Sequence, residues 1–268
     1  MVSAERFLLT LWTADPRLAR TADEAGVDRI GVDLEQLGKE ERQRSRGTWI
    51  SPHHEEDLDA LAPVLARAKL FARINPINPG SEREVESVLA RGAQVLMLPM
   101  AMDAAQAAEL VRLVRGRAEV VLLVEHIDAM RRLREIVRVS GVSEVHIGLN
   151  DLAISLGLRN RWMALANGVM QDAGAIVRGA GLRFGLGGIG RAGDDQLPVP
   201  ADLIYAEYAR TGATSALLAR SFFVEGIDLA REIDRARAAL EAWRHRTPEE
   251  IAAAHAELAR CAARSDVW

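Results

Sequence analysis

Two carboxylates, Glu125 and Asp151, each follow a short apolar run of the kind that forms a buried β-strand. Glu125 closes the run VVLLVE, and Asp151 comes shortly after the run EVHI. The carboxyl ends of parallel strands form an open mouth, where carboxylate oxygens can bind a hard divalent cation. We interpret this pair as a binding site for a divalent cation.

Further polar side chains follow two other apolar runs. The segment Gly-Val-Asp-Leu-Glu-Gln places Asp33 and Glu35 on one side of an extended chain and Gln36 on the other. The segment Phe-Ala-Arg-Ile-Asn-Pro contributes Arg73 and Asn75, whereas the run ending Leu-Pro-Met carries little chemistry of its own. A guanidinium binds a carboxylate through two parallel hydrogen bonds, so Arg73 is a candidate for binding an acidic substrate.

These acids also have a simpler interpretation. Acidic residues after strands often cap the next helix, and Asp151 could cap a helix that begins at Leu152. Asp33 or Glu35 could serve only to hold Arg73 in an ion pair. We favour the metal site because Arg73 and a glycine-rich segment are expected at the same rim.

Eight apolar runs alternate with helical stretches along the chain. The predicted strands are Phe7–Trp12, Arg29–Leu34, Leu70–Ile74, Val95–Leu98, Val120–Glu125, Glu144–Ile147, Arg183–Leu186 and Ser215–Leu218. Alternating strands and helices predict a parallel sheet, so the fold class is α/β. Eight repeats in about 250 residues favour a closed (β/α)₈ TIM barrel over an open doubly wound sheet.

Two further helices are predicted after the eighth strand, at Ile227–His245 and Thr247–Ala263. The second begins Thr-Pro-Glu-Glu, which offers an N-cap threonine, a proline at the first helical position and a glutamate at the third. We expect residues 1–226 to form the catalytic barrel and residues 227–268 to form a helical extension. The extension would pack on the barrel or on a neighbouring subunit, and the second case predicts a homo-oligomer.

The composition narrows the classes of partner. Of 268 residues, 49% are hydrophobic and 27% charged, as in an ordinary globular protein. No apolar run approaches the length of a membrane span and the first residues lack a signal-peptide cleavage site, so we expect a cytoplasmic protein without a membrane partner. A net charge of −4 with 4% aromatic residues argues against nucleic acid. The single cysteine, Cys261, is interpreted as a packing residue.

The segment 185–190 formally matches the dinucleotide-binding pattern GxGxxG, with Glu207 at a tolerable distance for a ribose contact. However, the residues after it are typical of a loop rather than of a helix that opens on pyrophosphate. We therefore favour a glycine loop at the barrel mouth. There the amides of Gly187 and Gly188 would approach a substrate oxygen, with Arg191 near the entrance.

Together these residues resemble the HpcH/HpaI aldolase and citrate lyase β-subunit family of the phosphoenolpyruvate/pyruvate-binding barrels. The resemblance covers about Ala22 to Phe223. Its motifs, in the family's order, are Asp-Leu-Glu at 33–35, Arg-Ile-Asn-Pro at 73–76, Leu-Pro-Met at 98–100, Glu125, and Gly-Leu-Asn-Asp-Leu at 148–152. It implies that Glu125 and Asp151 hold Mg²⁺ or Mn²⁺ and that Arg73 binds the carboxylate of a pyruvate-like or acyl group. The implied reaction is retro-aldol or retro-Claisen cleavage through a metal-held enolate.

Elementary physical chemistry agrees with that reaction. Breaking a bond next to a carbonyl leaves negative charge on the enolate oxygen, which a divalent ion and the Arg73 guanidinium would stabilise. Two protein carboxylates leave coordination positions open, so a 2-oxo acid could chelate the ion, and oxalate would mimic the enolate. Gln36, Asn75 and Asn150 are the neighbouring amides expected to contact this substrate.

One position departs from the family's pattern. Relatives carry a histidine base or a second acid after the acid of strand two, whereas here the position is Gln36, and a neutral amide cannot abstract a proton. His53 and His54 are candidate substitute bases because imidazole titrates near neutrality. Alternatively, Ser51-Pro52 caps the next helix and both histidines are solvated.

The same loop contains a positive cluster of Lys39, Arg42, Arg44 and Arg46. This cluster could bind a phosphate or an extra carboxylate, although solvated charges are the commoner case. Two alternatives to the lyase therefore remain. One is a phosphoenolpyruvate-type synthase, hydrolase or isomerase acting on a phosphorylated or multi-carboxylate substrate, and the other is a non-catalytic barrel that lost its base at Gln36.

Overall fold

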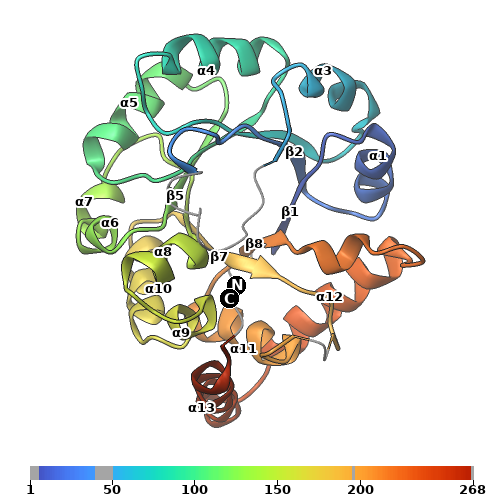
Figure 1. Ribbon diagram of the computed structural model, residues 1–268, viewed down its shortest axis with the longest axis vertical. Coiled ribbons are helices and arrows are strands. Elements are labelled where there is room, and N and C mark those ends of the chain that lie inside the picture. Colours follow the sequence, from blue (N-terminus) through green and yellow to red (C-terminus); the bar gives the residue numbers. More distant parts are fainter. Residues whose placement is uncertain (1–5, 40–50, 195–196, 267–268) are drawn as a thin grey trace.

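The structure of the protein, a computed structural model, describes residues 6–39, 51–194 and 197–266. Its strands form one closed parallel barrel in the order β1 to β8 (Figure 1). They are β1 Leu8–Trp12, β2 Arg29–Asp33, β3 Lys69–Arg73, β4 Val95–Leu98, β5 Glu119–Val124, β6 Glu144–Ile147, β7 Arg183–Ile189 and β8 Ser215–Leu218. The predicted α/β class and (β/α)₈ TIM-barrel architecture are confirmed.

Helices surround the ring of strands (Figure 1). They are α1 Pro16–Glu24, α3 Asp57–Leu61, α4 Ser81–Ala90, α5 Ala104–Val114, α6 Ile127–Arg131, α7 Leu133–Ile136, α8 Leu149–Ser155, α9 Arg161–Leu165, α10 Val169–Gly179 and α11 Ala201–Thr211, with 3₁₀ turns η1 Ala62–Val64 and η2 Arg220–Phe223. Most strand residues are buried on both faces, as expected of a parallel sheet covered by helices.

The two faces of strands β3, β4 and β5 belong to different apolar clusters. Residues such as Val32, Ala72 and Leu122 pack outward in the large cluster beneath the helices. The alternate residues Phe71 and Met97 lie in a smaller apolar cluster formed by β3, β4 and β5. The period of two along a strand places these alternate residues inside the barrel, so the interior is filled by side chains and function is confined to its rim.

The chain ends in two helices, α12 Leu229–Arg244 and α13 Pro248–Arg264. The predicted capping box of α13 is present: Thr247 Oγ1 accepts from the Glu250 amide at 3.2 Å, and Glu250 Oε2 accepts from the Thr247 amide at 2.9 Å. The buried Glu207 of α11 lies 2.8 Å from His255 Nδ1 of α13. Glu207 thus attaches α13 to α11, which is a different use from the ribose contact considered above.

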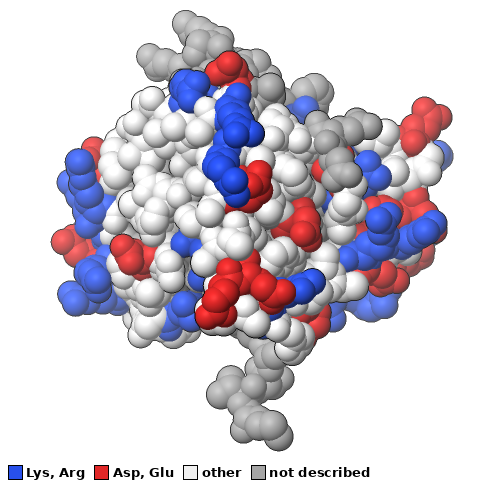
Figure 2. Space-filling view, turned by 90° about the horizontal axis from the view of Figure 1, so that it is seen from below, with Lys and Arg blue, Asp and Glu red and all other residues white. Residues whose placement is uncertain are grey.

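No helix within the described ranges is both long and apolar enough to cross a membrane. Figure 2 shows basic and acidic side chains next to one another over the visible face, with uncharged surface between them.

Candidate metal and substrate site

Six charged side chains gather at the carboxyl ends of β2, β3, β5 and β6. The members of this mouth cluster are Asp33, Glu35, Lys39, Arg73, Glu125 and Asp151. Each is between 2% and 8% exposed, although charged residues are normally solvated. The site residues predicted from four separate segments are therefore brought together, and Lys39 joins them.

Arg73 is fixed from several directions. Its Nε and Nη2 atoms each donate to Asp33 at 2.7 Å, and Nη2 also lies 3.2 Å from Glu35 Oε2. Its guanidinium stacks 4.1 Å from the ring centroid of Trp12. Burial alone would lower the pKa of Arg73, but Asp33 and Glu35 raise that pKa above its ordinary value. Arg73 is a permanent cation in one orientation.

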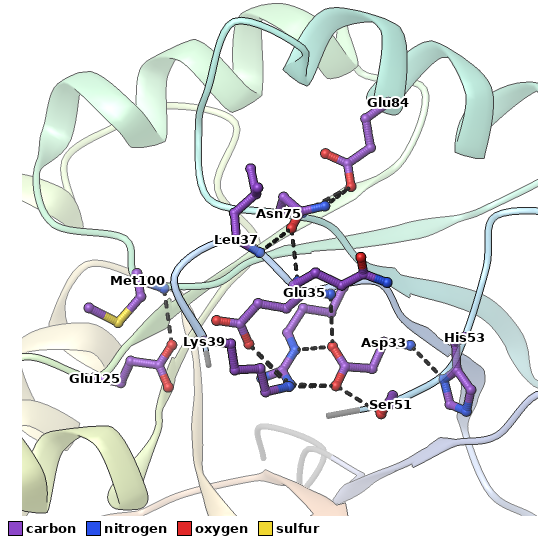
Figure 3. A network of polar contacts seen from close by, with 12 residues as sticks. Asp33, Glu35, Leu37, Lys39, Ser51, His53, Asn75, Glu84, Met100 and Glu125 are labelled. Carbon is purple, nitrogen blue, oxygen red and sulfur yellow. Dashed lines mark hydrogen bonds and ion pairs between the residues drawn. The ribbon is translucent and has the colours of Figure 1, made fainter. Parts of the chain in front are cut away.

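Asp33 holds Arg73 in an ion pair, which is the alternative role that the sequence suggested for Asp33 or Glu35. Besides Arg73, its carboxylate accepts from Lys39 Nζ at 2.9 Å, Ser51 Oγ at 3.1 Å and the Glu35 amide at 3.2 Å (Figure 3). Burial would raise the pKa of Asp33, yet Arg73 and Lys39 hold it well below its ordinary value. Asp33 is therefore suited to positioning Arg73 and not to accepting a proton.

Lys39 is not part of a solvated charge run. Its ammonium lies 2.9 Å from Asp33 Oδ2 and 3.5 Å from Glu35 Oε2, and the residue is buried. The interpretation of Lys39 as a loop cation available to a substrate phosphate is wrong. The other members of that predicted cluster, Arg42, Arg44 and Arg46, lie outside the described residues.

Glu125 directly follows β5 and is oriented by backbone. Its Oε1 atom accepts from the Met100 amide at 3.0 Å (Figure 3). Met100 has a φ of 48°, the left-handed region that non-glycine residues rarely adopt. A Cβ at Gly148 would lie 2.6 Å from Glu125 Oε2, so only glycine leaves room for this carboxylate. Neither Met100 nor Gly148 was singled out from the sequence for this contact.

Asp151 lies in the first turn of α8, which begins at Leu149 with Gly148 as its N-cap. The alternative in which Asp151 caps the helix is therefore wrong. Burial, followed by the charges of Glu35 and Asp151, raises the pKa of Glu125 to about 8, with Arg73 opposing this rise. Glu125, Asp151 and Glu35 thus interact as like charges at the barrel mouth.

The protein ligands of an ion would be few. In ranges 6–39, 51–194 and 197–266, no group of three or more His, Cys, Asp or Glu side chains has the spacing of a ready-made metal site. An ion held by Glu125 and Asp151 would take its remaining oxygens from water and substrate. Open positions of this kind are typical of catalytic rather than structural sites.

The predicted amide ligands have different environments. Gln36 and Asn150 are exposed. Asn75 Oδ1 accepts from the amides of Gln36 and Leu37 at 2.9 and 3.0 Å, and its Nδ2 donates to Glu84 at 2.8 Å (Figure 3). The Asn75 side chain therefore shapes the loop after β2, with both ends of its amide engaged.

The two candidate histidine bases, His53 and His54, lie in different surroundings. His53 Nδ1 accepts from the Asp33 amide at 3.0 Å, and Figure 3 shows His53 on the opposite side of Asp33 from Glu125. Burial lowers the pKa of His53. His54 is exposed, so only His53 borders the mouth cluster. Ser51 binds Asp33 instead of capping a helix, which corrects the capping interpretation.

The predicted glycine loop is the end of a strand. β7 continues to Ile189, whereas sequence placed its end at Leu186, and the next helix begins only at Ala201. The Gly187 carbonyl lies 3.0 Å from His146 Nε2, and the Gly188 carbonyl accepts from Tyr208 at 3.1 Å. Because no helix opens directly after these glycines, they cannot form a dinucleotide fingerprint.

Comparison with known proteins agrees with this architecture. The chain is 28% identical over 244 residues to a hydroxypyruvate/pyruvate aldolase of Pseudomonas aeruginosa, covering 80% of this chain and 84% of that protein. The solved HpcH/HpaI aldolase of Desulfitobacterium hafniense DCB-2 aligns with a TM-score of 0.60 at 19% identity, over 91% of this chain and 95% of that one. Protein CitE of Mycobacterium tuberculosis, solved with magnesium and pyruvate, aligns with a TM-score of 0.62 at 21% identity, over 96% and 98%.

The family model described as HpcH/HpaI aldolase/citrate lyase matches residues 6–178. This segment runs from β1 into α10 and includes every member of the mouth cluster. Because the match spans more than half of the chain, the protein belongs to the HpcH/HpaI aldolase/citrate lyase family and is an enzyme of the aldolase and lyase class.

Proposed function

We propose that this enzyme is a divalent-metal-dependent carbon–carbon lyase that forms or cleaves a bond next to the carbonyl of pyruvate or a related 2-oxo acid. The observation that carries the proposal is the charge of the mouth cluster. Among the described residues, four of its members are carboxylates and two, Arg73 and Lys39, are cations, and all six are buried. Carboxylate oxygens gathered at the carboxyl ends of barrel strands are the ligands that a hard divalent cation prefers.

The donor set fits Mg²⁺ or Mn²⁺. Glu125 and Asp151 would hold the ion, since both offer hard oxygen ligands at the mouth, whereas Asp33 is occupied by its two-pronged ion pair with Arg73. The raised pKa of Glu125 is the expected sign of a carboxylate that lacks a neighbouring cation of sufficient charge. When bound, the ion would act as a Lewis acid toward the substrate carbonyl.

The chain's own residues provide orientation and fixed charge. Arg73, locked by Asp33, presents a cation at the mouth toward which a substrate carboxylate or a developing enolate oxygen is attracted. His53 Nδ1 accepts a hydrogen bond from the Asp33 amide, so the neutral ring carries its own proton on Nε2. In this tautomer Nδ1 is occupied as an acceptor and Nε2 is a donor, so neutral His53 does not act as a general base.

The relatives support the substrate class. One is a hydroxypyruvate/pyruvate aldolase, and another was solved with magnesium and pyruvate. We therefore expect a 2-oxo acid with an aldehyde as the natural pair of substrates. The engagement of Lys39 with Asp33 and Glu35 weakens the alternative of a phosphorylated substrate, since it removes one cation from that binding surface.

Titration calorimetry with oxalate tests the proposal. Oxalate should bind in the presence of Mn²⁺, should not bind in excess EDTA, and should not bind to Asp151→Ala under either condition. Asp128→Ala is a matched control because it removes an exposed acid from the neighbouring helix α6. Absence of oxalate binding to the wild-type protein with Mn²⁺ would overturn the metal-lyase assignment.

A further inference from the structure

A second ionic cluster, with a buried ion pair at its centre, lies at the opposite end of the barrel from the mouth. Arg29 begins β2 and Glu144 begins β6, and Arg29 Nη1 lies 2.6 Å from Glu144 Oε2 across the barrel. Arg29 Nη2 also lies 3.1 Å from Glu119, which pairs with Lys69. Arg29 is 4% exposed and Glu144 only 1%. We name these four residues the base cluster.

His146 connects the base cluster to the rim. It lies two residues after Glu144 on β6, so both side chains point to the same face of the strand. Its Nδ1 lies 3.5 Å from Glu144 Oε1 and its Nε2 lies 3.0 Å from the carbonyl oxygen of Gly187. The ring is fully buried, so it exchanges neither partner for water.

Both partners of the ring accept hydrogen bonds and neither donates. A carbonyl oxygen has no proton, and Glu144 is ionised: burial would raise its pKa, but Arg29, His146 and Ser215 lower it to about 2. A neutral imidazole has one N–H and would leave one of these contacts repulsive. The shorter contact, 3.0 Å against 3.5 Å, is therefore the one in which a ring N–H, that of Nε2, donates to the Gly187 carbonyl.

The surroundings hold the ring in place. A Cβ at Gly185 of β7 would lie 2.2 Å from His146 Nδ1 and 2.5 Å from Ser215 Oγ, so this glycine provides the space that the ring occupies. The pairing of β7 with β8 is irregular between Gly185 and Gly188, and Gly187 has a φ of 50°. Gly187 is thus the point where the strand leaves regular geometry, and such irregularities redirect the chain beside active sites.

We propose that His146 is a positioning residue whose Nε2–H fixes the Gly187 carbonyl, and thereby the Gly187–Gly188 backbone at the barrel mouth. The groups that face the ring are Glu144 of β6, the Ser215 hydroxyl of β8 bound to Glu144, and the Gly187 carbonyl of β7, with Arg29 of β2 behind Glu144. The contact of His146 with Gly187 does not depend on the proposed function; only its expected effect on substrate binding rests on that function.

The hydrogen bond can be measured on the wild-type protein without metal or substrate. In a sample with ¹⁵N-labelled histidine, one of the six rings should show an Nε2–H proton that exchanges slowly with solvent. Its signal should be absent from His146→Gln, which assigns it. A His146 ring without a slowly exchanging Nε2–H would overturn the proposal, whatever the outcome of the metal experiments.

Two substitutions separate positioning from packing. Phe fills the ring's space without a donor, whereas Gln keeps an N–H for the Gly187 carbonyl. With Mn²⁺ present, His146→Phe should bind oxalate about tenfold more weakly, as for one lost hydrogen bond, and His146→Gln should recover part of this loss. Affinity for Mn²⁺ alone should stay within about twofold in both variants, because neither Glu125 nor Asp151 is altered.

The outcomes are distinguishable. Equal oxalate affinity in the wild type and a folded His146→Phe, with unchanged Gly187 and Gly188 amide shifts, would show that the ring positions nothing. Failure of the wild type itself to bind oxalate would overturn the proposed function. The amide shifts and the imidazole signals would still show whether His146 fixes the Gly187 carbonyl. A variant that loses its circular dichroism is replaced by His146→Gln in the same comparison.

Discussion

Glu125 and Glu144 are the same residue type, both buried at ends of strands in one barrel, and their pKa values are displaced in opposite directions. Burial raises both pKa values. Arg29 then lowers the pKa of Glu144 to about 2, whereas Glu35 and Asp151 help raise that of Glu125 to about 8. The base cluster thus supplies its own cations, and the mouth cluster has an excess of acid.

This difference separates a structural ionic cluster from a binding one. The base cluster contains two cations and two carboxylates before His146 is counted, so it is complete without a ligand. Among the described residues, the mouth cluster has four carboxylates and two cations. A charge count over the two clusters therefore distinguishes the two ends of the barrel, which composition and hydropathy cannot do.

The largest effect is expected from breaking the balanced cluster. Glu144→Ala leaves Arg29 buried without its closest carboxylate and should lower the free energy of unfolding by about 3–5 kcal/mol. Urea denaturation of the metal-free protein measures this loss. Glu109→Ala is the control, since its ion pair with Arg112 is exposed and its removal should leave stability unchanged. Equal stability of the two variants would contradict the structural role of Glu144.

The next effect concerns pH and the unbalanced cluster. Glu125 keeps a proton in the folded protein up to about pH 8, whereas the unfolded chain releases it near the ordinary pKa of 4.5. The folded state binds more protons in this window, so its stability should fall as pH rises from about 5 to 8, by roughly 2–4 kcal/mol. Unfolding in EDTA at both pH values measures the decrease.

Two controls sharpen this pH experiment. Glu125→Gln removes the titrating group and should make stability nearly independent of pH over the same window. Saturating Mn²⁺ should have the same effect in the wild type, because the ion replaces the proton as the compensating charge. A wild-type protein whose stability in EDTA is flat from pH 5 to 8 would show that the mouth cluster has no charge excess.

A smaller effect is expected at the loop that covers the mouth cluster. Asn75→Ala removes the acceptor for the amides of Gln36 and Leu37 and should destabilise the protein by about 1–2 kcal/mol. Gln36→Ala is the matched control because it retains the backbone amide that Asn75 binds. If both variants lose the same stability in urea, the side chain of Asn75 is not what holds this loop.

The smallest effect concerns Met100. Met100→Gly relieves the left-handed conformation but adds flexibility to the unfolded chain, so we expect a gain of about 0.5 kcal/mol with oxalate affinity retained. Met100→Val should instead destabilise by about 1–2 kcal/mol and weaken Mn²⁺ binding, because a β-branched residue resists this backbone conformation. Thermal unfolding and metal titration measure both. A stabilising Met100→Val would show that the backbone is not strained.

Local patterns were sufficient to predict much of this fold. Seven of the eight strands end within two residues of their predicted ends, because an apolar run in the sequence coincides with each strand. Strand β7 continues to Ile189 through glycines, whose hydropathy does not indicate a strand. The pairing of Arg73 with Asp33 was also foreseen as one alternative. Contacts across the barrel were not: the Arg29–Glu144 ion pair and the contact of His146 with Gly187 join residues distant in sequence.

Closure of the barrel joins Leu8 of β1 to Ser215 of β8, and Arg237 of α12 adds bonds to the Phe7 carbonyl and to Asp28. During synthesis the first strand therefore leaves the ribosome with one edge that has no partner until roughly 200 more residues have followed. At about 5–20 residues per second, this interval lasts on the order of 10–40 s. An unpaired strand edge is prone to aggregation, so the nascent chain is most exposed to aggregation in the interval before the ring is complete.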